Sequence, residues 1–181
     1  MGKRRIIMLI ILMVAVSLFI WIQFFEVPSK AKIGEEKLRQ DPLTHSFDDV
    51  TQYAATYMGD ASNTNGLLEA LPFHQYKQSI EMDEDALKLT VYYTYDEQVA
   101  LEKMQQVIVY NATAVFSLID QVQEIEWILN DQTYVVTRDR VEKWFGRTLV
   151  DFSEPEVFEE KVQQQLDKGL SNWFSVYTES E

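Results

Sequence analysis

Twenty consecutive residues near the N-terminus carry no charge, and this run constrains how the chain can be organised. Residues 6–25 read IIMLIILMVAVSLFIWIQFF, with Ser17 and Gln23 as their polar members. As a helix with a rise of 1.5 Å per residue, the run is about 30 Å long, which matches the hydrocarbon core of a bilayer. Aromatic residues such as Trp21 lie toward its C-terminal end, where an interfacial belt is expected. The pattern predicts a transmembrane anchor over residues 6–25.

Cations before the run set its expected orientation. Lys3, Arg4 and Arg5 directly precede the apolar residues, and positive charge favours the cytoplasmic side. We therefore expect residues 1–5 to form a cytoplasmic tail and the rest of the chain to lie outside the cytoplasm. Four cations also follow the run, and they reduce the difference in positive charge between its two ends: Lys30, Lys32, Lys37 and Arg39.

A cleaved signal peptide is the alternative interpretation of the run. Signal peptides have an apolar region of about 7–15 residues that ends at a small-x-small cleavage site. Here the run is longer and ends in bulky residues, and Ser29-Lys30-Ala31 is a poor cleavage site. The chain has no cysteine, which excludes a lipoprotein. An uncleaved anchor fits the sequence better.

The rest of the chain is acidic. Of the 16 lysines and arginines, three precede residue 26, whereas all 29 acids lie within residues 26–181. These residues therefore carry a formal net charge of −16. Such a domain is repelled by the phosphates of nucleic acids. The absence of cysteine also excludes disulfides, zinc–thiolate sites and cysteine nucleophiles. We interpret the negative charge as a source of solubility, with a cationic partner or a surface for weakly bound divalent cations as the alternative. We expect no cofactor, no specific metal site and no nucleic acid partner.

Two stretches of alternating residues predict β-hairpins. Residues 76–82 and 87–95 alternate apolar with polar side chains around an acidic turn at 83–85, which is the period of a half-buried strand. Residues 124–129 and 134–136 repeat the pattern. The acidic turn lacks the spacing of a calcium-binding loop, and we interpret Glu124 and Glu126 as the solvated face of an edge strand.

Helices are predicted around these hairpins. Ser46 and Asp49 begin a helix that we expect to end in a left-handed cap at Gly59. A long helix over residues 98–120 is apolar on most sides in its second half, so we expect the sheet to bury it. A last helix follows the Ser153 cap. The fold class is therefore α+β, with an antiparallel sheet built from two hairpins, a long central helix and flanking helices. Residues 26–45 show little periodicity and are assigned to a linker, and residues 46–181 to the domain.

Few residues suggest chemistry. His45 and His74 are the two histidines, and both lie beside turns with no serine nucleophile motif nearby. An S-x-x-K match at residues 29–32 lies in the linker and lacks the other motifs of penicillin-binding proteins. A cationic cluster stands out in the otherwise acidic domain, and its members are Arg138, Arg140, Lys143 and Arg147. We interpret it either as internal pairing with carboxylates or as an interaction patch for an anionic partner. No catalytic, cofactor or metal residue is predicted.

A turn at residues 57–62 carries a resemblance to a known family. The matching residues are Tyr57, Gly59, Asp60 and Ser62 in a Y-x-G-D-x-S motif, followed by Leu68, Leu71 and Pro72 in an L-x-x-L-P step. They resemble an uncharacterised domain family of membrane-anchored extracytoplasmic proteins of Gram-positive bacteria. The resemblance covers roughly residues 47–95, and Met58 replaces the valine expected there. It implies a location and a fold, but no catalytic residues.

These observations favour a non-enzymatic sensory or protein-interaction module of the cell envelope. Its expected partners are the lipid bilayer, through residues 6–25, and an envelope protein or an anionic wall polymer. An accessory or inhibitor protein for cell-envelope enzymes is the first alternative. A hydrolase that depends on carboxylates alone is the second, and a conserved inward-facing acid pair in a pocket would distinguish it.

Overall fold

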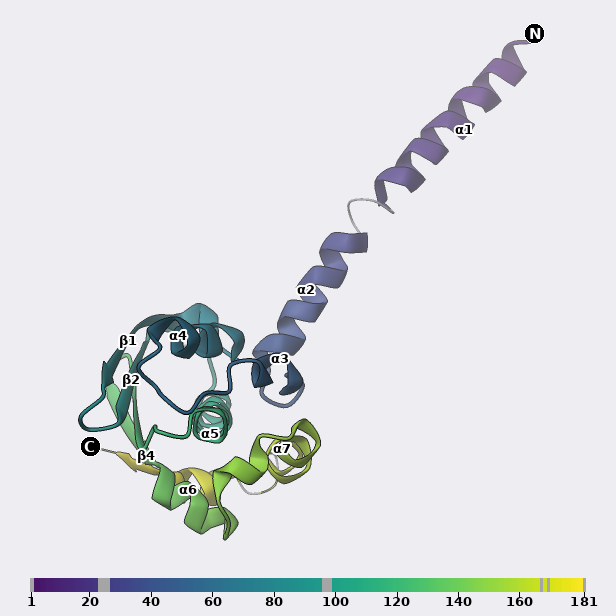
Figure 1. Cartoon of the computed structure of the whole chain (residues 1–181). Coiled ribbons are helices and arrows are strands. Elements are labelled where there is room, and N and C mark those ends of the chain that lie inside the picture. Colours follow the sequence, from purple (N-terminus) through teal and green to yellow (C-terminus); the bar gives the residue numbers. More distant parts are fainter. Residues whose placement is uncertain (1, 23–26, 96–98, 167, 169, 181) are drawn as a thin grey trace. The chain divides into compact units, whose positions relative to one another are not determined.

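The chain forms two compact units, Met1–Leu38 and Arg39–Glu181. The computed structural model describes residues 2–22, 27–95, 99–166, 168 and 170–180 (Figure 1). The second unit begins upstream of residue 46, because residues from Arg39 onward pack with the domain.

The first unit consists of helical segments. Helix α1 (Lys3–Trp21) contains most of the uncharged run, and within it the Ser17 hydroxyl donates to the Met13 carbonyl at 2.8 Å. Across the described residues, no helix has both the length and the apolar character needed to span a membrane. Residues 23–25 of the predicted anchor lie outside the described residues.

Much of the stretch assigned to a linker is helical. Helix α2 (Val27–Gln40) lies there, although its sequence shows little apolar periodicity. The segment is rich in glutamate, lysine, leucine, arginine and glutamine, which have high intrinsic helix propensity. Propensity therefore indicates the helix where periodicity does not.

The second unit is built on one five-stranded sheet with the order β1-β2-β3-β4-β5. The strands are β1 (Lys77–Asp83), β2 (Lys88–Tyr93), β3 (Glu124–Leu129), β4 (Gln132–Thr137) and β5 (Thr178–Ser180). Both predicted hairpins are present, as β1–β2 and β3–β4. The prediction of a wholly antiparallel sheet was wrong, because β2 pairs with β3 in parallel. Parallel neighbours need a crossover connection, and the long helix α5 (Leu101–Leu118) makes it.

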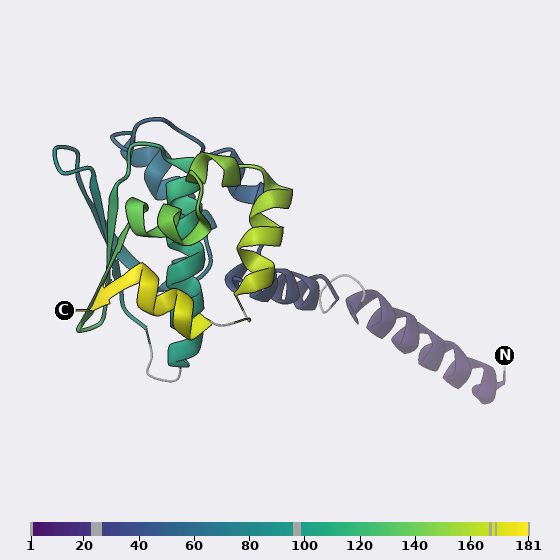
Figure 2. The same ribbon diagram turned by 90° about the horizontal axis from the view of Figure 1, so that it is seen from below.

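Helix α5 is the centre of the core. Met104 and every residue from Gln106 to Ile119 are buried, which confirms the central helix expected from its apolar pattern. On one side it packs against the inward residues of the sheet, among them Leu89, Val91 and Trp127. The helices of the second unit lie on this side of the sheet, and no described element of this unit covers the opposite face (Figures 1 and 2).

C-terminal elements cover the other side of α5. They are α6 (Arg138–Phe145), η3 (Leu149–Phe152), α7 (Pro155–Lys161), η4 (Gln163–Gln165) and α8 (Leu170–Tyr177). The single last helix predicted after Ser153 is therefore α7 followed by η4, and α8 was not predicted. Ser153 is not the N-cap of α7, because its hydroxyl donates to the Val150 carbonyl.

The first predicted helix of the domain is mostly replaced by turns and one bridge residue. Only α3 (Asp48–Thr51) is helical before α4 (Ala61–Ala70), and the short η2 (His74–Tyr76) follows. Between α3 and α4, Ala55 bridges Ile119 in parallel, and its amide donates to the Leu118 carbonyl at 2.7 Å. This backbone pairing with the end of α5 draws the segment out of a helix.

A buried histidine fixes the start of the domain. His45 is 2% exposed, and its Nε2 lies 2.9 Å from the Ala70 carbonyl and its Nδ1 2.8 Å from the Tyr110 hydroxyl. Because a carbonyl only accepts, the neutral ring donates from Nε2 and accepts at Nδ1. Gln163 donates to the carbonyls of Pro42 and His45, at 2.8 Å each. Burial lowers the pKa of His45.

This arrangement predicts a pH-dependent stability. With its pKa lowered in the folded state, His45 takes up a proton more readily when the chain unfolds, where its pKa is about 6.5. The stabilisation is therefore complete above that value, and the free energy of unfolding falls as the pH drops from about 7 toward 5. Urea denaturation across this range measures the slope. We expect His45→Gln to reduce the dependence of the free energy of unfolding on pH, and His74→Gln to leave it unchanged. Equal slopes in the two variants would contradict the assignment to His45.

Candidate functional site

The uncovered face of the sheet collects charged and aromatic side chains from β1, β2 and β3 and an apolar side chain from β4. Residues that alternate with the buried ones point to it, since successive side chains of a strand lie on opposite faces. Its charged members are Glu81, Asp83, Lys88, Glu124 and Glu126. Tyr92 and Ile128 are neighbours in the β2–β3 register, and Val135 of β4 lies beside Glu126. We call this set the open face.

One lysine organises the carboxylates of β3. Lys88 Nζ lies 2.6 Å from Glu126 Oε2 and 3.9 Å from Glu124 Oε1. Thr90, 6% exposed, donates its hydroxyl to the same Glu126 oxygen at 3.2 Å. The hydrogen bond with Glu126 raises the pKa of Lys88, so the ammonium is retained at neutral pH. The open face thus holds four carboxylates against one ammonium.

A hollow of about 250 Å³ lies within the open face. Glu81 and Asp83 line it from β1, Lys88 and Tyr92 from β2, and Glu126 from β3. Partial burial and the neighbouring carboxylate of Glu81 raise the pKa of the Tyr92 phenol, which therefore keeps its proton. An aromatic ring beside carboxylates suits a cationic group, because the ring face and the carboxylates both attract positive charge.

The sequence indicated the acids of the open face but not their setting. Glu124 and Glu126 share a face as predicted, yet β3 is an interior strand with β2 and β4 on either side. The interpretation of an edge strand was therefore wrong, because the parallel β2–β3 pairing was not foreseen. That pairing also brings Lys88 and Tyr92 beside these acids, and no local pattern in the sequence could show it. Within the described part of the chain, no group of three or more histidine, aspartate or glutamate side chains is arranged to hold a metal ion.

The motif turn at residues 57–62 starts a helix. Asp60 is the N-cap of α4, and its carboxylate accepts from the Asn63 amide at 3.0 Å. Tyr57 is 70% exposed, and Ser62 is exposed as well. A Cβ on Gly59 would lie 3.0 Å from the carboxylate oxygens of Glu84, so the small residue admits the β1–β2 turn. Gly59 is not the predicted left-handed cap, since Gly146 (φ 67°), after α6, is the glycine with a positive φ among the described residues.

The cationic cluster is divided between the interior and the surface. Arg138 is 8% exposed and donates from Nε to the Val122 carbonyl and from Nη2 to the Ile119 carbonyl, at 2.8 Å each. Its guanidinium also lies 5.3 Å from the centre of the Phe116 ring. Ile119 is the C-cap of α5, where positive charge complements the helix dipole. Arg138 therefore holds the end of the central helix.

The other members of the cluster reach the surface to different degrees. Lys143 is exposed and pairs with Asp139 on the same helix. Arg140 is half-buried, and Arg147 is exposed with its guanidinium 6.0 Å from the centre of the Phe152 ring. An interaction patch for an anionic partner remains a prediction, which now depends on Arg140, Lys143 and Arg147.

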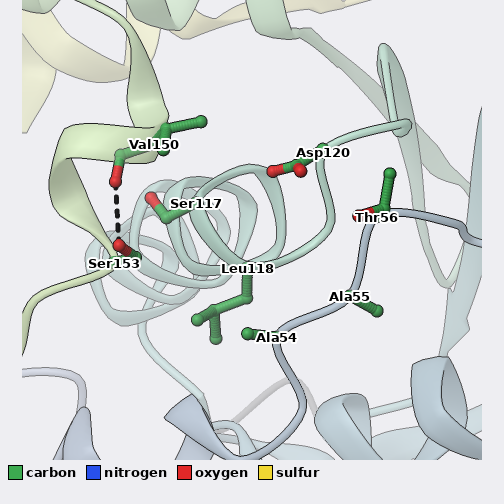
Figure 3. A pocket seen from close by; sticks show the side chains of 8 residues that line it. All are labelled: Ala54, Ala55, Thr56, Ser117, Leu118, Asp120, Val150 and Ser153. Carbon is green, nitrogen blue, oxygen red and sulfur yellow. Dashed lines mark hydrogen bonds between the residues drawn. The ribbon is translucent and has the colours of Figure 1, made fainter.

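A second hollow, of about 320 Å³, lies beside the end of α5 (Figure 3). Residues 54–56 face Val150 and Ser153 of the η3 segment across it, with Ser117, Leu118 and Asp120 between them. The Ser117 and Ser153 hydroxyls donate to backbone carbonyls, and Asp120 is the one carboxylate among the lining residues. This lining contains neither a base beside a nucleophile nor an acid pair, and it defines no reaction. His45 lies elsewhere, with both ring nitrogens in the buried contacts described above.

Comparison with known proteins identifies a domain class without a known activity. The profile of one family, described as Domain of unknown function (DUF4825), matches residues 50–139. The match is consistent with the uncharacterised domain family suggested by the motif, and it spans the motif turn, both hairpins and α5. No curated protein and no solved structure matches the chain.

The capping role of Asp60 is testable in the motif turn. Asp60→Ala removes the acceptor for the Asn63 amide at the start of α4, which we expect to lower the free energy of unfolding by about 1 kcal/mol. Asp60→Asn keeps an acceptor at the same position and should retain most of the stability. Chemical denaturation of the two variants and the parent measures this difference. If the Asp60→Ala variant were as stable as the parent, the role of Asp60 as the N-cap of α4 would not contribute to stability.

The buried position of Arg138 gives a second prediction. Arg138→Met removes the guanidinium donor from the Val122 carbonyl and leaves the Ile119 carbonyl with the Val122 amide at 3.4 Å. We therefore expect a loss of about 2 kcal/mol in the free energy of unfolding. Lys143→Met removes the same charge from an exposed site and should change stability little. Thermal and urea denaturation compare the two. Equal, small losses of stability in the two variants would contradict a structural role for Arg138 at the end of α5.

Proposed function

We propose that this protein is a membrane-anchored, extracytoplasmic interaction module of the cell envelope that binds a partner without catalysing a reaction. The open face is the observation that carries the binding role. It presents a half-buried ring, a hollow and ordered charges from three adjacent strands, on a rigid sheet that the buried α5 supports. Charged surfaces of this kind suit reversible protein contacts, because electrostatic complementarity favours specificity and rapid association.

We propose the membrane anchor from the sequence of residues 6–25, and one hydrogen bond within α1 is compatible with it. Twenty residues without charge match the length of a bilayer core. The Ser17 hydroxyl is satisfied within the helix by the Met13 carbonyl, as a polar group in lipid requires. The cations at residues 3–5 favour a cytoplasmic N-terminus and a domain on the outer side.

Topology is testable with a single label site, because the chain has no cysteine. One cysteine added after Glu181 is treated with a membrane-impermeant maleimide on intact cells. We expect labelling without lysis and recovery of the protein in the membrane fraction. A second cysteine variant, with the residue inserted after Met1, should be labelled only after lysis. The reverse pattern would place the domain in the cytoplasm, and recovery in the soluble fraction would remove the anchor.

Binding through the open face is tested in the same cells. A photo-crosslinking amino acid in place of Tyr92 should trap a partner, whereas the same group in place of Glu156 on α7 should not. Both positions lie in the domain but on different elements. Equal crosslinking at the two positions, or none at Tyr92, would contradict a specific role for the open face.

A further inference from the structure

We infer that the occupant of the open face is a basic segment of a partner protein, with a lysine or arginine side chain in the hollow between β1, β2 and β3. This deepens the proposed function and rests on it. The inference starts from charge complementarity, since four carboxylates and one ammonium leave the face negative. A cationic partner is attracted to this face and an anionic one is repelled.

The hollow has the chemistry of a pocket for one cationic side chain. Glu81 and Glu126 line it from different strands, with Tyr92 between them on β2. A guanidinium or ammonium group can donate to the carboxylates while it lies against the phenol ring. Glu126 already accepts from Lys88 and Thr90, which fixes its orientation. Glu81, which also interacts with the Tyr92 hydroxyl, provides a second carboxylate on the opposite wall.

A divalent metal ion fits the hollow less well than an organic cation. The Lys88 ammonium sits 2.6 Å from Glu126, where it repels an additional metal charge and occupies the carboxylate oxygen. Calcium also takes six to eight oxygen ligands, whereas the hollow offers carboxylates from three residues and a phenol. An incoming ammonium or guanidinium needs fewer ligands and can form directed hydrogen bonds.

The surface beside the hollow indicates a protein segment rather than a small polyamine. Ile128 lies next to Tyr92 in the register, and Val135 lies next to Glu126, so half-buried apolar side chains continue the face across β3 and β4. A segment with a basic and an apolar residue two positions apart matches this surface. Side chains at positions i and i+2 of an extended chain lie on the same face, so they can place a cation in the hollow and an apolar side chain on Ile128. A small polyamine has no side chain for the second contact.

Three peptides test the inference on the full chain in a non-ionic detergent. The first repeats Lys-Ser-Val-Ser, which places lysine and valine in turn on one face of an extended chain. The second replaces each lysine with glutamate, and the third replaces each lysine with serine. Fluorescence anisotropy measures affinity, and backbone amide shifts locate the contact. We expect the lysine peptide to bind with shifts at Lys88, Tyr92 and Ile128, and the other two to bind at least about tenfold more weakly.

Matched variants separate the open face from general attraction to an acidic protein. Glu81→Gln with Glu126→Gln removes two charges from the hollow, and Glu156→Gln with Glu159→Gln removes two from α7. We expect the first pair to weaken binding of the lysine peptide by about tenfold and the second by less than about twofold. Amide dispersion verifies that both remain folded. Equal losses in the two pairs would overturn the inference.

The other outcomes distinguish a failure of the basic-partner inference from a failure of the proposed binding function. If the serine or glutamate peptide binds the open face as well as the lysine peptide, the basic partner is wrong and the interaction module stands. If no peptide shifts the open face at millimolar concentration, the inference falls, and crosslinking at Tyr92 then decides the proposed function by itself. If calcium displaces the lysine peptide more than sodium of equal ionic strength does, the hollow is a metal site instead.

Discussion

The near-complete burial of α5 is the constraint on which the rest of the domain depends. A helix without a solvent face must be covered on opposite sides, so the sheet alone cannot satisfy it. The C-terminal elements provide the second layer, and their aromatic side chains pack around Tyr177, whose hydroxyl lies 3.4 Å from Thr113 of the helix. The polar residues of α5 also need partners inside the core. Thr113 and Ser117 donate to carbonyls of the preceding turn, and Asn111 donates to the Pro72 carbonyl.

The same constraint leaves one face of the sheet free. Since α5 is both the crossover between β2 and β3 and the packing partner of the sheet, the helices gather on its side. The parallel pairing then sets Lys88 beside Glu124 and Thr90 beside Glu126. A wholly antiparallel arrangement of the two hairpins would place different residues opposite each other. The chemistry of the open face is therefore a consequence of how the core is closed.

Local patterns in the sequence predict the elements better than their assembly. The period of two identifies both hairpins, and the apolar second half of residues 98–120 identifies a buried helix. The pairing of β2 with β3 depends on contacts far apart in the sequence, which neither pattern contains. Residues 52–58 were predicted as helix because apolar residues recur there, yet backbone pairing of Ala55 with the end of α5 prevails.

The candidate site shows the same division. Glu124 and Glu126 were recognised as neighbours on one face, because strand alternation alone dictates it. Arg138 was grouped with surface cations, because its charge is visible in the sequence while its burial against the end of α5 is not. One signal could have suggested a buried role for Arg138. It is a cation that directly follows a strand, at a position where the C-terminus of a packed helix can lie close to it. Without the β3–β4 register, the contact between Arg138 and the C-terminus of α5 cannot be predicted.

The proposed membrane anchor would compensate for weak binding at the proposed open face. Carboxylates at a solvated surface contribute modestly and are screened by salt, so a contact built on Glu81 and Glu126 is weak and rapidly reversible. For a freely diffusing protein such a contact would rarely be occupied. A domain tethered by residues 6–25 meets a partner in the same membrane at a much higher effective concentration, which compensates for low affinity. Weak electrostatic recognition is therefore sufficient here, provided that the partner shares the membrane surface.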